Sequence, residues 1–531
     1  MAPRMALAVC CALVAAVLAA AVPVLDEESY LDIARQLDPW RPYDWWRPWP
    51  PWGLQREADA FVYAHPPGFL IWVRAWLQQA GGTTTHIAPL KMAAGIPWAA
   101  LLGWSVGRLA ERMTSRPWLT VSIWLASPIV VLGLQRGLMP DLMLTALLTC
   151  AVVAWVEGHA SKADRSAQVR WWVGGAFSLA LAVSVKYSAL VLVPALVLHQ
   201  LALRPRPRAV AFWATLGLLL VGMETWLAVS YGRVHLVEVL SRADEIGRSP
   251  FGARVLGVSS RLGLGMLVLP LLARPFRKAM PVVGGAALGV AWLGAPEGTV
   301  FSEFVLLALA ACAGLGLVAV GARELLGPSA PRADRTPADG ILLGGWALAV
   351  IAGVMVGHNF GAPRYLLPAM APLALVLGRI CASRLDLRML AWTGTLVSAG
   401  VALVWSWSEH RFFDAADAAA RSVVLAHPEG GCFTGEWSFR HHLQEAGWTF
   451  CGSLDDMSAL PSGSIIAGPV QSSPGELPDG LIKLHEATFG WSPLRLVDAA
   501  EGVAWYGESL GARPVAWHPG PLEGVATWKV P

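Results

Sequence analysis

The sequence predicts a polytopic α-helical membrane protein that ends in a small α/β domain. Of its 531 residues, 55% are hydrophobic and 15% are charged, whereas soluble domains average roughly 45–50% and 25%. Apolar segments long enough to cross a bilayer recur up to residue 408 and then stop. We therefore expect a transmembrane domain over residues 1–408 and an extracytoplasmic α/β domain over residues 409–531.

About 13 crossings are expected. The first runs from Met5 to Leu25 and is longer than the roughly 7–15 apolar residues of a cleavable signal, so it predicts a retained helix. The others lie at about 87–107, 117–134, 141–158, 171–185, 187–203, 209–229, 259–273, 280–295, 303–322, 341–358, 365–380 and 389–408. Around Lys186, the chain forms either a short hairpin or one bent helix.

The distribution of Lys and Arg predicts the orientation, because positively charged loops stay in the cytoplasm. With the N-terminus inside, all six predicted inside loops carry two or more Lys or Arg, although the outside connection 230–261 also contains several Arg. An odd number of crossings then places residues 409–531 outside. We expect a multi-pass protein of the cytoplasmic membrane.

The first outer loop, residues 26–86, is expected to fold against the membrane surface. DEESYLDIARQL has apolar residues at helical spacing, and HPPGFLIWVRAWLQQAGG has a second apolar stripe between two prolines and two glycines. Between them, DPWRPYDWWRPWPPWG contains five Trp and five Pro, which excludes a regular helix. This stretch is either an interfacial anchor, the simpler interpretation, or a platform for carbohydrate or lipid.

The tail from residue 409 has short β-like pieces, SIIAG, VAWYG, PVAWH and VATWKV, and a predicted helix in GEWSFRHHLQEAG. Its length of about 120 residues is enough for a core of its own. Cys432 and Cys451 are compatible with one disulfide in an oxidising compartment and equally with two free thiols.

Charge and cysteine spacing limit the classes of partner. The net charge is +3 without a polybasic segment, so nucleic acid is not an expected partner. The cysteines lack metal-ligand spacing. No certain cofactor follows from the sequence, and a divalent cation stays open.

Five ionisable residues are expected to meet at the outer face: Asp26, Glu27, Asp141, Lys186 and Arg364. A carboxylate there would deprotonate an acceptor while cations stabilise a departing phosphate, as glycosyl transfer requires. The alternatives are helix N-caps for the three acids and contacts with lipid headgroups for the two cations.

Two further positions have weaker signals. His65 before Pro66-Pro67 is either a turn residue or a substrate-binding residue, with no partner at ligand spacing to indicate a metal. Glu224, near the outer end of its predicted helix, is either a structural hydrogen-bond partner or a site residue.

The chain resembles glycosyltransferase family 39, which includes protein mannosyltransferases and lipid A aminoarabinose transferases. Five segments carry the resemblance: LDEESYLDIARQL, YAHPPGFLIWVRAWL, SPIVVLGLQRGLMPDLMLTALL, VKYSALVLVPALVL and APRYLLPAMAPLALVLG. The family implies a GT-C membrane fold and a sugar donor on a polyprenyl phosphate, transferred with inversion to an extracytoplasmic lipid, polysaccharide or protein.

The same resemblance assigns roles to individual residues. By this resemblance, Asp26 matches the position of the catalytic base, and Glu27 lies beside it. Asp141 matches the position of a second acidic site residue. Lys186 and Arg364, the latter with Tyr365, are similar to the positions that meet the donor phosphate.

Two alternatives remain beside this enzyme. A transporter or flippase of lipid-linked sugars would also place charges in a bundle of many helices, but it predicts related halves or helices broken at the midplane. The other alternative is a catalytically inactive relative that serves as a scaffold.

Overall fold

The computed structural model describes most of the chain. The described residues are 2–18, 27–45, 65–80, 87–160, 165–203, 207–241, 249–266, 280–294, 301–326, 337–358, 361–382, 385–451, 454–472, 475, 477–499, 501–506, 513–516 and 519–531. Asp26 and the Trp- and Pro-rich stretch beyond Trp45 lie outside these ranges.

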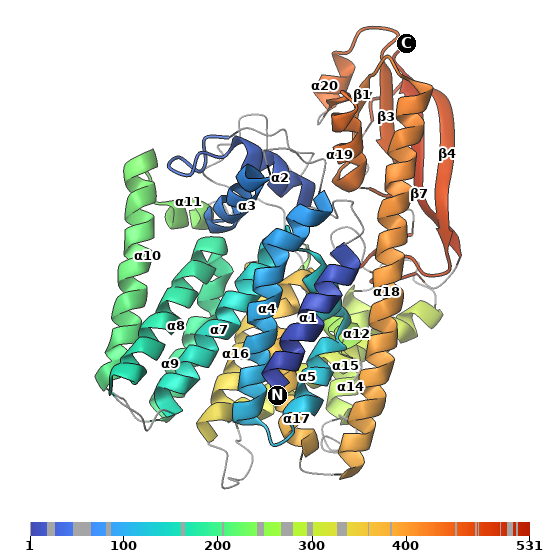
Figure 1. Ribbon diagram of the computed structural model, residues 1–531. Helices are drawn as coiled ribbons and strands as arrows, with labels where there is room; N and C mark the ends of the chain where they lie inside the picture. Colours follow the sequence, from blue (N-terminus) through green and yellow to red (C-terminus); the bar gives the residue numbers. More distant parts are fainter. Residues whose placement is uncertain are drawn as a thin grey trace.

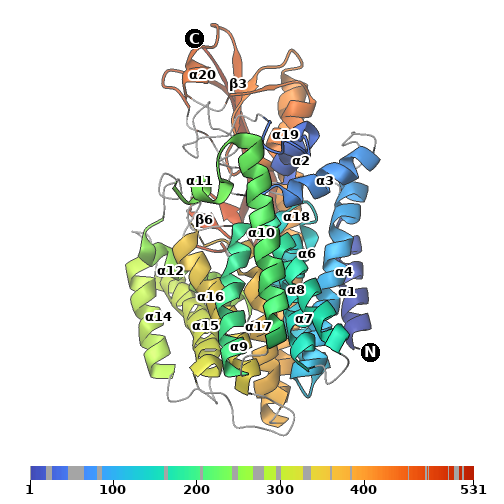
Figure 2. The same ribbon diagram turned by 90° about the vertical axis from the view of Figure 1, so that its left-hand side faces the viewer.

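A bundle of long helices forms the body of the protein, and a β-sheet stands at one end of it (Figures 1 and 2). Each of the predicted apolar segments overlaps a helix or a pair of helices. The long helices are α1 (Ala2–Leu18), α4 (Ile87–Met113), α7 (Pro140–Ala160), α8 (Arg165–Val185), α10 (Val210–Tyr231), α12 (Phe251–Gly265), α14 (Met280–Gly294), α15 (Phe301–Leu326), α16 (Pro337–Gly357), α17 (Pro363–Ala382) and α18 (Leu385–Ala426).

Six helices of the described residues are long and apolar enough to cross a membrane. A seventh span results if α5 (Pro117–Leu125) and α6 (Pro128–Gln135), which meet at 67°, are counted as one. The bend follows from Pro128, which cannot donate a backbone hydrogen bond and keeps Ser127 extended. The predicted count of about 13 crossings therefore stays a prediction.

The segment around Lys186 consists of two separate helices. After α8 the backbone of Lys186 is extended, and the chain then forms a 3₁₀ turn, η2 (Tyr187–Val191), followed by α9 (Leu192–Ala202). Helix α8 packs against α7 and α10, whereas α9 packs against α16. The break places Lys186 directly after the end of α8, so the direction of its side chain is not set by the spacing of residues in that helix.

Short helices cover the end of the bundle that faces the sheet (Figure 1). They are α2 (Glu27–Gln36), α3 (Gly68–Gln79) and α11 (His235–Ser241). The apolar face predicted for α2 is confirmed, because Tyr30, Ile33 and Ala34 are buried. In α3, Phe69 and Val73 are buried in the same way.

Helix α18 joins the bundle to the sheet without interruption (Figure 1). It has 42 residues, which at 1.5 Å per residue correspond to about 60 Å, roughly twice the hydrocarbon thickness of a bilayer. The predicted domain boundary after residue 408 thus falls inside a helix. The loss of hydrophobicity there marks a change in the surroundings of the helix, since Ala419, Ala420 and Val423 pack against the sheet.

The sheet has five strands in the order β2-β1-β3-β7-β4. The strands are β1 (Cys432–Phe433), β2 (Thr449–Phe450), β3 (Ile465–Pro469), β4 (Ile482–Ser492) and β7 (Gly520–Lys529). Strand β1 pairs in parallel with β2 and β3, and β7 lies antiparallel between β3 and β4. The predicted strands in SIIAG and VATWKV correspond to β3 and β7, and the predicted helix in GEWSFRHHLQEAG to α19 (Trp437–Glu445).

The remaining pieces of the tail differ in character. VAWYG contains only the short strand β6 (Val503–Ala504), and PVAWH contributes one isolated bridge at Ala516. Cys432 and Cys451 form a disulfide, which answers the question that their spacing left open. It joins Cys432 of β1 to Cys451, the residue after β2, and so links the two strands at one edge of the sheet.

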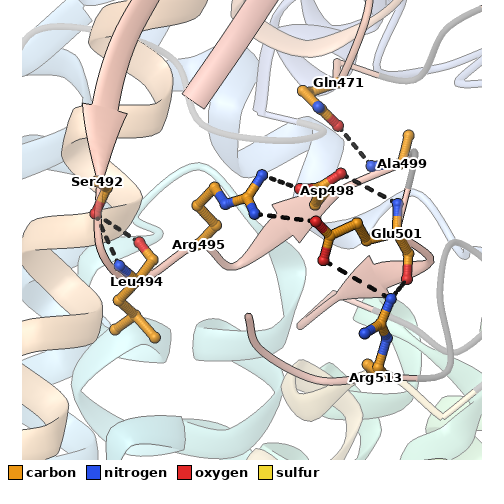
Figure 3. Close-up of polar contacts among 8 residues, drawn as sticks. All are labelled: Gln471, Ser492, Leu494, Arg495, Asp498, Ala499, Glu501 and Arg513. Carbon is orange, nitrogen blue, oxygen red and sulfur yellow. Dashed lines mark hydrogen bonds and ion pairs between the residues drawn. The ribbon is translucent and has the colours of Figure 1, made fainter. Parts of the chain in front are cut away.

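A second, two-stranded sheet pairs β5 (Val497–Asp498) with β6. We call residues 494–499 and 501–506, which carry it, the hairpin segment. Arg495 donates hydrogen bonds to Asp498 and Glu501, and Arg513 donates to the carbonyl of Glu501 (Figure 3). This network stiffens a segment that has few backbone pairs of its own.

Candidate functional site

Asp141 and Lys186 form a buried ion pair. Asp141 is the second residue of α7, and Lys186 lies in the break after α8. The Lys186 Nζ is 2.7 Å from the Asp141 Oδ1, and both side chains are almost fully buried. Among the described residues, the Asp141 Oδ2 has no hydrogen-bond partner. Because a buried acceptor without a partner is costly, this oxygen indicates a place for a ligand.

Tyr365 lies between two cations. The Lys186 Nζ is 5.0 Å from the centre of its ring, and the Arg364 guanidinium is 5.1 Å from the same centre. Arg364 also donates a hydrogen bond of 3.2 Å to the Tyr365 hydroxyl. Cations near an aromatic face are attracted by its quadrupole, so the ring helps to fix the positions of both charges.

His358 belongs to the same cluster, although sequence reasoning missed it. Its ring stacks on Tyr365 at 4.1 Å with an angle of 18°. Its carbonyl accepts a hydrogen bond from Arg254 at 3.0 Å. A histidine at the end of the apolar segment 341–358, six residues before Arg364, was the available signal.

The structure therefore brings Asp141, Lys186, Arg364 and Tyr365 together at the ends of α7, α8 and α17. His65, directly before the Pro66-Pro67 pair, interacts electrostatically with Asp141, and its carbonyl accepts a hydrogen bond of 3.1 Å from the Tyr43 hydroxyl. His65 thus lies at the edge of this cluster.

Glu27 has a different position from the one expected for a catalytic acid. Its side chain is fully buried, and its Oε2 is 2.7 Å from the Nζ of Lys91 on α4. Its Oε1 accepts the backbone N–H of Leu138 at 3.1 Å. The geometry supports Glu27 as a positioning residue for the turn between α6 and α7, whereas Asp26 lies outside the described residues.

Sequence reasoning also missed another buried ion pair, on the other side of that turn. Arg136 donates to the Glu409 Oε1 at 2.6 Å, and the Tyr506 hydroxyl donates to the same oxygen at 2.9 Å. These residues come from the α6–α7 turn, from the middle of α18 and from the end of the hairpin segment. A cation in an otherwise apolar stretch is the signal that marks Lys91 and Arg136.

Glu224 is a hydrogen-bond partner, one of the two possibilities that the sequence left open. Its Oε1 accepts the Tyr187 hydroxyl at 2.5 Å, and its Oε2 accepts the N–H of Leu236 at 3.2 Å. The Tyr187 hydroxyl is also 2.7 Å from the His235 Nδ1. A largely apolar cavity of about 450 Å³ adjoins Glu224 on α10.

Over the described ranges, which omit Asp26, there is no group of three or more His, Cys, Asp or Glu placed to hold a metal ion. The polar atoms of the cluster are instead one carboxylate, one ammonium, one guanidinium, one phenol and two imidazoles. This set suits an anion such as a phosphate better than it suits a cation.

The comparisons with known proteins point to membrane glycosyltransferases. The model of the alpha-(1->6)-mannopyranosyltransferase family, N-terminal domain, matches residues 63–202, which contain His65, Asp141 and Lys186. This match agrees with the resemblance to glycosyltransferases that was drawn from the sequence. No curated protein matches the chain.

Solved structures give weaker similarities. ArnT from Cupriavidus metallidurans bound to undecaprenyl phosphate is 16% identical, with a TM-score of 0.40 over 87% of this chain and 92% of that one. The arabinofuranosyltransferase AftD from Mycobacteria is 16% identical, with a TM-score of 0.42 over 99% of this chain and 40% of that one. The Archaeoglobus fulgidus oligosaccharyltransferase is 12% identical, with a TM-score of 0.41 over 81% and 58%.

Proposed function

We propose that this protein is an inverting glycosyltransferase that takes a sugar from a polyprenyl-phosphate donor at the outer face of the cytoplasmic membrane. The observation that carries the proposal is the buried pair of Asp141 and Lys186 beside Arg364 and Tyr365. The family match supports transfer of a sugar, and its description makes mannose the first sugar to test.

The cluster has the charges that the reaction needs. As the bond from the anomeric carbon to the donor phosphate breaks, the phosphate leaves with the electron pair and gains negative charge. Lys186 and Arg364 stabilise that charge, and preorganised cations in a buried site do so without reorganisation. The Asp141 Oδ2 accepts a hydroxyl hydrogen of the sugar.

The acceptor side completes the reaction. An acceptor hydroxyl or amine attacks the anomeric carbon on the face opposite the phosphate, and Asp26 takes its proton. Asp26 directly precedes α2, whose first residue, Glu27, is anchored to Lys91 on α4. The acceptor is a lipid, a polysaccharide or a protein outside the membrane.

The side of the membrane is part of the same proposal. The basic inside loops of the sequence support a cytoplasmic N-terminus. Asp141 follows the turn that Glu27 of α2 contacts, and Figure 2 shows α2 at the end of the bundle where the sheet stands. No observation favours the transporter alternative, because the residues of the cluster lie together at helix ends and the family match is to a transferase.

Reconstitution tests the proposal directly. The purified protein in proteoliposomes should transfer radiolabelled mannose from polyprenyl-phosphate mannose to an extract of envelope lipids and glycans, with polyprenyl-phosphate arabinose as the second donor. Asp26→Asn should abolish transfer, whereas Asp38→Asn, at an exposed turn after α2, should not. Wild-type turnover in Asp26→Asn would exclude Asp26 as the base, and no transfer from either donor would exclude this function.

A further inference from the structure

The turn between α6 and α7 is held from two sides. On one side Glu27 binds the N–H of Leu138, and on the other Arg136 binds Glu409. Gly137 touches α4 so closely that a Cβ there would lie 2.5 Å from the carbonyl oxygen of Lys91. The turn therefore cannot shift without breaking one of these contacts, and Asp141 follows it directly.

The contact between Arg136 and Glu409 also involves a residue from outside the helix bundle. Tyr506, at the end of the hairpin segment, donates to the same Glu409 oxygen as Arg136, and the Arg136 guanidinium lies 5.3 Å from the Tyr506 ring centre. Burial raises the pKa of Tyr506 well above its usual value, and the charge of Glu409 raises it further. The hydroxyl therefore stays protonated and acts as a donor.

The hairpin segment is itself fastened into the end of the bundle. Arg261 on α12 is completely buried and donates hydrogen bonds to the carbonyls of Trp505 at 3.0 Å and Ala504 at 2.5 Å. The Ser408 hydroxyl donates to the carbonyl of Leu494 at 2.8 Å. These contacts fix the position of the hairpin segment relative to α12 and α18.

Arg136 opens the turn that leads into Asp141 of the cluster. Its side chain is almost fully buried, and among the described residues its Nε has no hydrogen-bond partner. The Glu409 carboxylate, 2.6 Å from the guanidinium, offsets the positive charge of Arg136 at this buried position.

We propose that the hairpin segment is a working part of the membrane site, in which Tyr506 is a positioning residue that acts through Glu409 to hold Arg136 at the start of the turn that leads into Asp141. The ligand that benefits is the anionic phosphate of the donor, so this inference rests on the proposed function. The role of the C-terminal tail is then to complete the donor site as well as to form the sheet.

Steady-state kinetics of a matched pair of variants tests it. Tyr506→Phe removes the hydrogen bond to Glu409 and keeps the ring. Thr149→Val removes one buried hydrogen bond, from the Thr149 hydroxyl to the carbonyl of Thr145 within α7, and lies outside both the hairpin segment and the cluster. Since a hydrogen bond to a charged group is worth a factor of about ten or more, Tyr506→Phe should raise the donor KM about tenfold and change kcat less than about twofold. Thr149→Val should leave both parameters within about twofold.

Binding of undecaprenyl phosphate without a sugar is the second measurement. Its stabilising effect on thermal unfolding should be smaller in Tyr506→Phe than in Thr149→Val and the wild type. Equal effects of both variants, or none from Tyr506→Phe, would overturn the inference alone. A wild-type protein that neither transfers sugar nor is stabilised by undecaprenyl phosphate would instead overturn the proposed function, and this inference with it.

Discussion

The ammonium of Lys186 lies 2.7 Å from the carboxylate of Asp141, where neither side chain is exposed to solvent. The two residues are 45 positions apart in the sequence. Each lies next to the start of an element, since Asp141 is the second residue of α7 and Lys186 directly precedes η2. The pair therefore fixes the relative height of two helix ends, in addition to the role that we propose for it at the donor phosphate.

Removing one member of this pair should separate stability from activity. Lys186→Met leaves the Asp141 carboxylate buried without its cation, which costs about 3–5 kcal/mol, so thermal unfolding in nanodiscs should occur at a lower temperature. The double variant Asp141→Leu/Lys186→Met should recover much of the stability and still be inactive in transfer. Lys483→Met, which changes an exposed lysine of β4, is the matched control and should resemble the wild type. An active double variant would contradict the proposed site.

Glu27→Gln should be milder than Asp26→Asn. The amide oxygen of glutamine can still accept the Leu138 N–H, and only the charge opposite Lys91 is lost. We expect transfer to fall by less than about tenfold, with a drop in unfolding temperature that Glu27→Gln/Lys91→Met partly reverses, because the second change removes the stranded cation. Complete loss of transfer in Glu27→Gln, with the protein still folded, would show that Glu27 takes part in the chemistry.

The stability of the sheet should depend on pH through Glu523 on β7. Burial raises the pKa of this carboxyl to about 7, against the pull of hydrogen bonds from Ser472, Gly524, Gln471 and Val470. The unfolded chain releases the proton near 4.5, whereas the folded chain keeps it to about 7. The contribution of Glu523 to the free energy of unfolding is therefore fully present below about pH 4.5, and it decreases by about 3 kcal/mol as the pH rises to about 7.

Glu523→Gln provides the check on that pH dependence. The variant should show a flatter dependence of unfolding temperature between about pH 4.5 and pH 7, because its amide does not titrate. An unchanged profile in the variant would assign the pH dependence to other groups.

The disulfide between Cys432 and Cys451 should be worth about 3 kcal/mol, because it closes a loop of 19 residues. Cys432→Ser/Cys451→Ser should lower the unfolding temperature of the sheet, measured by protease resistance of the tail. Cys312→Ser, which removes a free thiol on α15, should not. Equal resistance of the double variant and the wild type would argue that the bond adds little to the fold.

The sequence predicts most helices and most members of the cluster, His358 excepted, because both leave local signals. Apolar runs mark the long helices, helical spacing marks α2 and α3, and charges next to apolar segments mark Asp141, Lys186 and Arg364. The helical continuation of α18 past residue 408 also had a signal, since Ala419, Ala420 and Val423 recur at helical spacing. Hydrophobicity alone does not reveal this continuation of the helix.

Partnerships between distant segments could not be predicted in this way. Arg136 and Glu409 are 273 positions apart, and Tyr506 lies a further 97 positions along the chain. Nothing local indicates that a tyrosine in a polar tail reaches an arginine between two apolar helices. The buried position of Glu27 depends in the same way on Lys91, whose approach is set by the packing of α4.

The continuity of α18 has a consequence for the spacing between membrane and sheet. Glu409 and the sheet-facing Ala419 and Val423 sit on one uninterrupted helix. A single residue inserted between Glu409 and Ala419 would turn the whole sheet by about 100° around the helix axis, whereas seven residues would restore its facing and raise it by about 10 Å. The helical phase of this stretch, rather than its composition, therefore sets the direction in which the sheet faces the bundle.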